Sequence, residues 1–431
     1  MYEWVYVVIL LVAAYAAVAW YVHYRNPSPG RFSFYGPILA VKTSKVGFLD
    51  RFTVISTFLR VYSTIGVAMV VLISATMVVL LFFSLQMTLV VQPEPTGIYA
   101  PQNLLLIPGI NEYVPATFAV WFALVLAIAV HEFGHGVLAR VEKIRVKAMG
   151  ALILVIPIGF FVEPDEEEME KARGISRVRV FGAGITNNVV VGAICFVLMI
   201  LLVGAAVPTT EPVIQGVYQN YSAYLAGVPA PSVITAINGT PVETREQVSA
   251  ILNTTHPGQD LTLSVDYEGQ PATYNLTLSE WPEGTEGRTS GFLGIYYYQP
   301  DLVIQTVSDS LNPLGMLRFL IVPFDTSMTG QQLSILAFDT PDTQFYEVPV
   351  PGFWVLVHIL FWSGWININL GIFNALPMIP LDGGYILKEG VDRTLEKRGL
   401  SRYAPSVTSA ISALILVLLA SLIMLPYLLH A

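Results

Sequence analysis

Charged residues are scarce in this chain of 431 residues, where Asp, Glu, Lys and Arg together make up 12%. A soluble globular protein has about twice that fraction. Hydrophobic residues account for 54% of the sequence. This composition excludes an ordinary soluble domain and indicates an integral membrane protein in contact with the lipid bilayer. The length allows a membrane core and at least one further domain.

Cysteine and net positive charge are also lacking. The one cysteine, Cys195, lies in an apolar run, which excludes an intramolecular disulfide and any zinc site built on several thiolates. The net charge of −9 provides no basic face of the kind that nucleic-acid binding needs, so we expect no nucleic-acid partner. Any bound metal would therefore depend mainly on histidine and carboxylate ligands.

Six apolar segments are long enough to cross a bilayer, which takes about 20 residues. They cover residues 2–22, 62–91, 115–139, 180–207, 351–373 and 405–429. The first segment is not preceded by a basic region and is followed by basic residues, which favours an uncleaved anchor over a signal peptide. The apolar stretch 150–162 is too short to span and is predicted to be re-entrant or β-structured.

The distribution of lysine and arginine predicts the orientation. Nineteen of the 22 basic residues lie in the segments 23–60, 138–180 and 373–403. Cytoplasmic flanks hold the excess of positive charge. We therefore expect both termini and the insert 208–350 to be extracytoplasmic. The four glycosylation sequons, at Asn220, Asn238, Asn253 and Asn275, all fall in that insert, although turns rich in Asn and Thr produce such triplets by composition alone.

The motif HEFGH, residues 131–135, follows a run without any charged residue, 116–130. On a helix, His131 and His135 lie one turn apart on the same face, so both imidazoles can bind one zinc ion. Glu132 can take a proton from a water whose pKa zinc lowers towards about 7. The alternative is a histidine pair satisfied by neighbouring helices, which would leave Glu132 as an uncompensated charge in lipid.

A catalytic zinc ion has three protein ligands and one open position. The candidate for the third ligand is Asp382, in the segment NALPMIPLDGG, 374–384. Prolines end the preceding helix there and glycines let the backbone turn, and irregular backbone at membrane depth is tolerated only where it lines a cavity. The alternative is a cytoplasmic surface loop with a solvated Asp382. The presence of HEFGH favours the ligand.

The two motifs together resemble the site-2 protease family of intramembrane zinc metalloproteases. The segment 131–165 is similar to the archaeal and metazoan branch, and FGAGITNN, 181–188, matches a further family motif except that Ile185 replaces its proline. The resemblance implies that His131, His135 and Asp382 hold one catalytic zinc ion and that Glu132 is the general base.

The resemblance also implies a substrate and a way of binding it. The family places a membrane-embedded β-hairpin after the catalytic helix, and its edge strand captures the substrate; residues 150–162 fit that role. Strand addition supplies the hydrogen bonds that a transmembrane helix loses when it unwinds. The implied partner is a transmembrane protein already trimmed on its extracytoplasmic side, cleaved in regulated intramembrane proteolysis. The alternative is that 150–162 only packs between helices.

Two asparagines are further candidates for the active site. Asn374 opens the Asp382 motif, and Asn188 lies near the cytoplasmic start of the fourth apolar segment. Their amides can stabilise the oxyanion of a tetrahedral intermediate or hold the substrate backbone. Alternatively, they form hydrogen bonds between helices, as asparagine often does in membranes.

Residues 211–298 differ in composition from their surroundings. The runs 260–267 and 273–280 alternate apolar and polar residues like half-buried strands, and 243–253 has helical spacing. The order of these pieces resembles a PDZ domain of the type attached to membrane proteases. Such a domain either binds an extended peptide by strand addition or acts as a steric filter for substrates.

The sequence thus predicts a polytopic α-helical membrane protein with about six transmembrane helices, a membrane-embedded β-hairpin and an extracytoplasmic α+β PDZ-like domain. Its expected parts are two N-terminal helices with a cytoplasmic loop, a first catalytic part, the PDZ-like domain, a connector, and a second catalytic part with the last helix: 1–92, 115–207, 211–298, 299–350 and 351–431. The rival function is a non-enzymatic membrane metal transporter, or a receptor with a structural zinc. We see neither the internal repeat common in transporters nor the fourth ligand of a structural site.

Overall fold

The structure is a computed structural model and describes residues 3–25, 31–103, 106–285 and 287–430. It consists of two compact units. The first comprises Met1–Leu198 together with His358–Ala431, and the second comprises Met199–Val357. All the residues of the candidate site belong to the first unit.

In the part of the chain that the structure describes, five helices are long and apolar enough to cross a membrane. They are α2 (Ser56–Val91), α3 (Phe118–Val141), α5 (Ile175–Val203), α11 (Phe353–Asn374) and α13 (Ala404–Leu429). Each coincides with a segment predicted from the sequence, so five of the six expected spans are confirmed as long apolar helices. Helix α1 (Glu3–Arg25) occupies the place of the first segment, 2–22. The side chains before residue 12 lie outside the described part of the chain, so that span stays a prediction.

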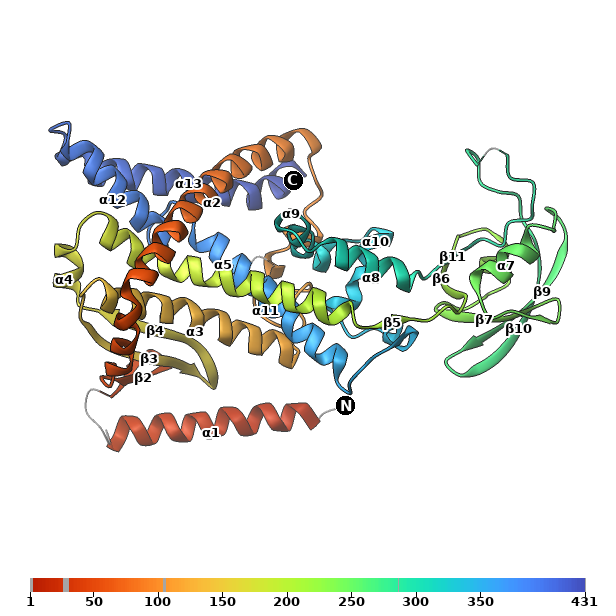
Figure 1. Ribbon diagram of the computed structural model, residues 1–431, viewed down its shortest axis with the longest axis horizontal. Helices are drawn as coiled ribbons and strands as arrows, with labels where there is room; N and C mark the ends of the chain where they lie inside the picture. Colours follow the sequence, from red (N-terminus) through yellow and green to blue (C-terminus); the bar gives the residue numbers. More distant parts are fainter. Residues whose placement is uncertain (1–2, 26–30, 104–105, 286, 431) are drawn as a thin grey trace. The chain divides into compact units, whose positions relative to one another are not determined.

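A four-stranded antiparallel sheet completes the first unit, together with the short helix α4 (Glu166–Lys171) and helix α12 (Asp382–Glu396). The strand order is β1-β2-β3-β4. The strands are β1 (Phe32–Tyr35), β2 (Ile38–Thr43), β3 (Val146–Leu154) and β4 (Ile156–Pro164). Strands β3 and β4 form a hairpin that contains the predicted stretch 150–162 and extends beyond it at both ends. Strand β4 lies beside α3 at one edge of the sheet (Figure 1).

The second unit contains the expected strands of 211–298. A six-stranded antiparallel sheet has the order β10-β9-β7-β6-β11, and β8 pairs with β7. Leu261, Leu263 and Val265 alternate into its core and pack with Val248 of the neighbouring helix. The elements of the unit are β5 (Val207–Pro208), β6 (Val213–Val217), α6 (Ser222–Leu225), β7 (Ser232–Ile237), β8 (Thr240–Pro241), α7 (Arg245–Leu252), β9 (Asp260–Tyr267), β10 (Gln270–Thr277), β11 (Ile295–Tyr297), α8 (Pro300–Asp309), α9 (Pro313–Leu317), α10 (Met328–Leu333) and β12 (Tyr346–Glu347).

Glycines let the helices of the first unit approach one another closely. A Cβ atom on Gly134 of α3 would lie 2.8 Å from the carbonyl oxygen of Ala183 on α5. A Cβ on Gly192 of α5 would lie 2.6 Å from a side-chain carbon of Ile368 on α11. Such contacts are typical of helix packing in membranes, where van der Waals contact replaces the hydrophobic effect. They place α5 directly against both α3 and α11.

Candidate metal centre

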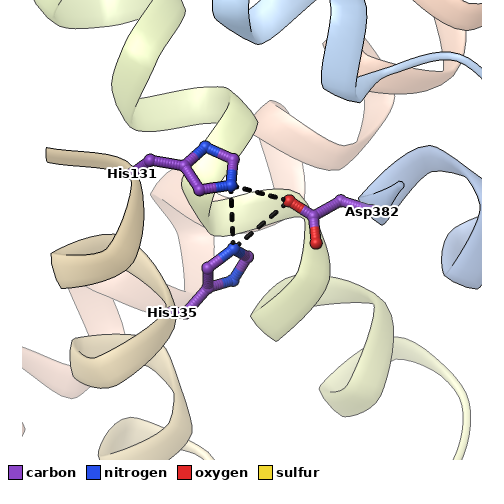
Figure 2. Close-up of side chains that lie close together, drawn as sticks. All are labelled: His131, His135 and Asp382. Carbon is purple, nitrogen blue, oxygen red and sulfur yellow. Dashed lines mark hydrogen bonds and ion pairs between the residues drawn. The ribbon is translucent and has the colours of Figure 1, made fainter. Parts of the chain in front are cut away.

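Three potential metal ligands from distant parts of the sequence converge in the first unit. The Nε2 atoms of His131 and His135 are 3.2 Å apart. Asp382 Oδ2 lies 3.1 Å from Nε2 of His131 and 3.2 Å from Nε2 of His135. Figure 2 shows both imidazoles projecting from α3 towards the carboxylate at the start of α12. Among the described residues, this is the one group of three or more His, Cys, Asp or Glu side chains with metal-ligand geometry.

These separations fit a single zinc ion. Ligand atoms at about 2.0–2.1 Å from zinc, arranged tetrahedrally, are about 3.3 Å from one another. Buried polar atoms are normally hydrogen-bonded. Within the described part of the chain, however, Asp382 Oδ2 is buried and has no hydrogen-bond donor, while it faces the two imidazole nitrogens. A cation at the centre of the three atoms would satisfy all of them.

Helix α3 places the two histidines. The side chain of Thr117 caps its first turn by accepting a hydrogen bond from the backbone N–H of Val120. On the opposite side of the ring from the metal site, His135 Nδ1 lies 2.8 Å from the carbonyl oxygen of Val180 on α5. A ring N–H donated to that carbonyl leaves the Nε2 lone pair directed at the site, as in other histidine ligands of metals.

A tight loop between α11 and α12 places the carboxylate. Asp382 is the first residue of α12. A Cβ atom on Gly383 would lie 2.3 Å from the carbonyl oxygen of Ala375, and one on Gly384 would lie 2.3 Å from the carbonyl carbon of Met378. Real Cβ atoms do not approach so closely, so only glycine allows the start of α12 to fold back onto the preceding loop. The two glycines of the LDGG sequence therefore fix where Asp382 lies.

Gly184 of α5 is a site residue that the sequence analysis did not identify. A Cβ atom there would lie 2.6 Å from Nε2 of His135 and 2.7 Å from Cε1 of His131. The residue lies within the FGAGITNN segment, but glycine has no side-chain chemistry that would single it out. Its role is visible only once α5 is seen to cross the two imidazoles.

Glu132 lies next to the first histidine and is half-buried. Its Oε2 atom accepts a hydrogen bond of 3.0 Å from the backbone N–H of Val162 on β4. The carboxylate of the expected general base is therefore held by the edge strand of the hairpin.

The two asparagines lie in different surroundings. Asn188 is fully buried on α5, and its Nδ2 is 3.4 Å from the carbonyl oxygen of Ala127, one turn before His131 on α3. Its Oδ1 atom is buried and has no hydrogen-bond partner in the described part of the chain. Asn374 is the last residue of α11 and donates to the carbonyl oxygen of Leu370 in its own helix, at 3.0 Å. The structure thus places Asn188 beside α3, and it leaves the expected role of each amide as a prediction.

The sequence is similar to a known peptidase family and to several known proteins. The sequence profile of peptidase family M50 matches residues 119–419. "Zinc metalloprotease RasP" of Geobacillus kaustophilus is 27% identical over 208 residues, which cover 48% of each chain. "Uncharacterized protein MJ0971" of Methanocaldococcus jannaschii is 24% identical over 287 residues, 64% of this chain and 60% of that protein. "Regulator of sigma-E protease RseP" of Escherichia coli is 25% identical over 229 residues, 50% of this chain and 49% of that protein.

The alignments with these relatives cover about half to three-fifths of their length. The matched family region, in contrast, extends over most of this chain and includes both the HEFGH helix and the start of α12. Of the long apolar helices, it includes α5 and α11 completely, α3 from its second residue onwards and the first part of α13, whereas α2 precedes it. The chain is therefore an integral membrane protein with several apolar spans, and it belongs to peptidase family M50.

Proposed function

We propose that this protein is an intramembrane zinc endopeptidase that hydrolyses peptide bonds in or near the transmembrane segments of membrane-protein substrates. The observation on which the proposal depends is the convergence of His131, His135 and Asp382, with ligand atoms 3.1–3.2 Å apart. Two ligands lie on a helix long and apolar enough to span a membrane. Membership of a peptidase family and the zinc-protease names of the relatives support the same reaction.

In this proposal His131, His135 and Asp382 hold one zinc ion. Bound zinc supplies Lewis acidity, which makes water acidic near neutral pH and polarises a carbonyl group. Glu132 takes the proton from the attacking water and delivers it to the nitrogen of the leaving amine. Burial of the site keeps bulk water away, and the carbonyl of Val180 keeps the His135 ring oriented. Asn188 and Asn374 are proposed to stabilise the oxyanion or hold the substrate backbone.

The edge of β4 is the proposed substrate-binding strand. An unwound transmembrane segment must find new partners for its backbone N–H and C=O groups, and a free strand edge provides them. Among the described residues, strand β4 has one pairing partner in its sheet, β3, and it lies beside the proposed catalytic helix α3. A membrane-embedded position of the β3–β4 hairpin belongs to this proposal.

The second unit is proposed to contain an extracytoplasmic PDZ-like domain, residues 211–298. Its six-stranded sheet and the helix α7 have the mixture of elements expected for such a domain. We propose that the active site lies towards the cytoplasmic side, as the lysine and arginine distribution favours, and that the domain admits substrates trimmed beforehand on the other side. A structural zinc site in a receptor or transporter would need four protein ligands, whereas three converge in the described part of the chain.

The test combines zinc analysis with cleavage of a model transmembrane substrate in detergent. Glu132→Gln is expected to retain zinc and to lose cleavage by at least about 100-fold, because it removes the proton acceptor. Glu142→Gln, at the C-cap position directly after the same helix, serves as the control for a change from carboxylate to amide. A Glu132→Gln variant that cleaves at the wild-type rate would show that the mechanism is wrong. Wild-type protein that binds no zinc would overturn the metal assignment.

A further inference from the structure

The backbone N–H of Val162 has two competing uses. In the structure it donates to Glu132 Oε2 at 3.0 Å. Val162 belongs to β4, which in the described part of the chain pairs with β3 on one side and with no strand on the other. Because successive residues of a strand direct their N–H groups to opposite sides, the N–H groups of Phe160 and Val162 both point to the unpaired edge. That edge is the one to which a further strand would add.

Space for a further strand exists at this edge. A cavity of about 350 Å³ is lined by α3 and by both strands of the hairpin, and Glu132 contributes to its wall. The remaining lining is apolar: Ala129, Val130, Phe133, Met149, Gly150, Phe160, Phe161 and Val162. An apolar cavity beside an unpaired strand edge suits the side chains of a membrane segment in extended conformation.

We infer that the N–H of Val162 restrains Glu132 until substrate binds. A substrate strand that pairs with the edge of β4 supplies its own carbonyl oxygen to this N–H and thereby releases the Glu132 carboxylate to act on water. Val162 is thus a positioning residue, which acts through its backbone. This inference rests on the proposed function, because it assigns Glu132 the role of general base.

The replacement of Glu132 by a substrate carbonyl as the acceptor of the Val162 N–H selects unwound substrates. A hydrogen bond to a carboxylate is stronger than one to a neutral carbonyl. A single substrate carbonyl is therefore a weak competitor for the Val162 N–H. A segment that pairs along the edge, and also bonds to Phe160, gains several backbone hydrogen bonds at once and can displace the carboxylate. The base is then freed only by a substrate that has already become a strand, which limits cleavage of short peptides.

Amide hydrogen exchange tests the restraint directly. In the zinc-loaded Glu132→Gln protein the Val162 N–H keeps an acceptor, so we expect slow exchange. In Glu132→Ala the acceptor is lost, and exchange at Val162 should become at least about tenfold faster. Adding a synthetic apolar transmembrane peptide in detergent should restore slow exchange in Glu132→Ala. Unchanged exchange at Val162 in Glu132→Ala, or no restoration by the peptide, would overturn the inference.

Cleavage kinetics provide a second test with opposite expected signs. Val162→Pro removes this N–H, and proline is tolerated at the outer edge of a sheet. We expect it to raise turnover of a short blocked peptide about tenfold, because Glu132 is freed, and to lower turnover of a transmembrane substrate by a similar factor. Phe160→Pro, the matched control, removes the neighbouring N–H from the same edge. It should lower turnover of the transmembrane substrate without raising that of the short peptide.

The two tests separate this inference from the proposed function. If Val162→Pro and Phe160→Pro lower both activities alike, Val162 has only a structural role in the edge and the inference is wrong, while the protease assignment stands. If wild-type protein cleaves neither substrate, the proposed function fails. The exchange measurements still decide whether Glu132 and a bound peptide compete for Val162.

Discussion

The imidazole of His135 and the backbone of Val180 are joined across two helices, with Nδ1 2.8 Å from the carbonyl oxygen. The contact fixes both the orientation of the ring and which nitrogen has the proton, since a carbonyl oxygen can only accept. Nε2 is then free to bind a metal. Helix α5 therefore supports the metal centre without contributing a ligand, and it does so through backbone groups that no substitution at Val180 would remove.

Gly184 lies on the same helix, and its contacts with the two imidazoles predict that a larger residue there weakens zinc binding. In Gly184→Ala the new methyl group would lie 2.6 Å from His135 Nε2 and 2.7 Å from His131 Cε1, so the imidazoles must move. We expect zinc affinity to fall by about 10- to 100-fold, as when residues that orient metal ligands are altered. Competition with a chelator measures this.

Gly182→Ala is the matched control on the same helix. Its nearest neighbour would be the tip of the Val67 side chain, at 3.1 Å, which can rotate away. Zinc affinity should stay within about twofold of the wild type, a change of less than 0.5 kcal/mol that is usual away from special features. Equal losses in both variants would indicate a general packing defect in α5.

Asp382→Asn tests the third ligand. An amide is a weaker zinc ligand than a carboxylate and has no charge, so we expect most of the bound zinc to be lost on gel filtration, together with at least about 100-fold of the activity. Asp392→Asn, at a half-buried position later on α12, removes a carboxylate that pairs with Lys388 at 3.0 Å. It should retain a full equivalent of zinc. Retention of zinc by Asp382→Asn would contradict the ligand assignment.

The parts of the site that were predictable from the sequence are those with local spacing. HEFGH implies two histidines on one helix face because the i, i+4 relation is built into the helix. Asp382 was predicted as a ligand from a loop, and the structure places it as the first residue of a helix of fifteen residues. The alternation of 260–267 likewise predicted β9 with its observed bounds, because the side chains of a strand alternate between two faces.

The parts that were not predictable depend on pairing between distant segments. Residues 32–43 were expected only as a cytoplasmic loop, but they form β1 and β2, and β2 pairs with β3 more than 100 residues later, Leu39 opposite Ile153. Short strands have no local signature of their partner. The role of Gly184 and the bond from Val162 to Glu132 depend in the same way on which surfaces meet, and spacing along the chain does not encode that.

A buried carboxylate on α12 provides a prediction about stability. Glu389 is 6% exposed, accepts a hydrogen bond of 2.5 Å from the backbone N–H of Gly174, and pairs with Arg177 at 3.7 Å. It lies two turns after Asp382 on the same helix face and ties α12 to the start of α5. Glu389→Ala leaves these partners unpaired, so we expect it to lower the free energy of unfolding by about 3 kcal/mol.

Glu396→Ala is the control for this prediction. Glu396 pairs with Arg173 at 3.7 Å, but both side chains are largely exposed. Exposed pairs contribute about 0–1 kcal/mol, so its loss should hardly lower the thermal unfolding midpoint. The two variants remove the same charge from one helix, and thermal unfolding in detergent compares them. Equal shifts would show that Glu389 is not a structural link between α12 and α5.

Asp342, in the second unit, predicts a dependence of stability on pH. Burial raises the pKa of its carboxyl to about 6, from an ordinary value of about 3.9. The folded protein holds this proton up to about pH 6, and the unfolded chain only to about pH 4. The stabilisation is therefore fully present below pH 4 and is lost as the pH rises through 6.

Asp342→Asn cannot titrate, so its unfolding midpoint should rise relative to wild type between pH 4 and pH 7. Asp339→Asn, at an exposed position three residues away, controls for the change of charge. If the difference between Asp342→Asn and wild type is flat across this range, the carboxyl of Asp342 is not the group that titrates.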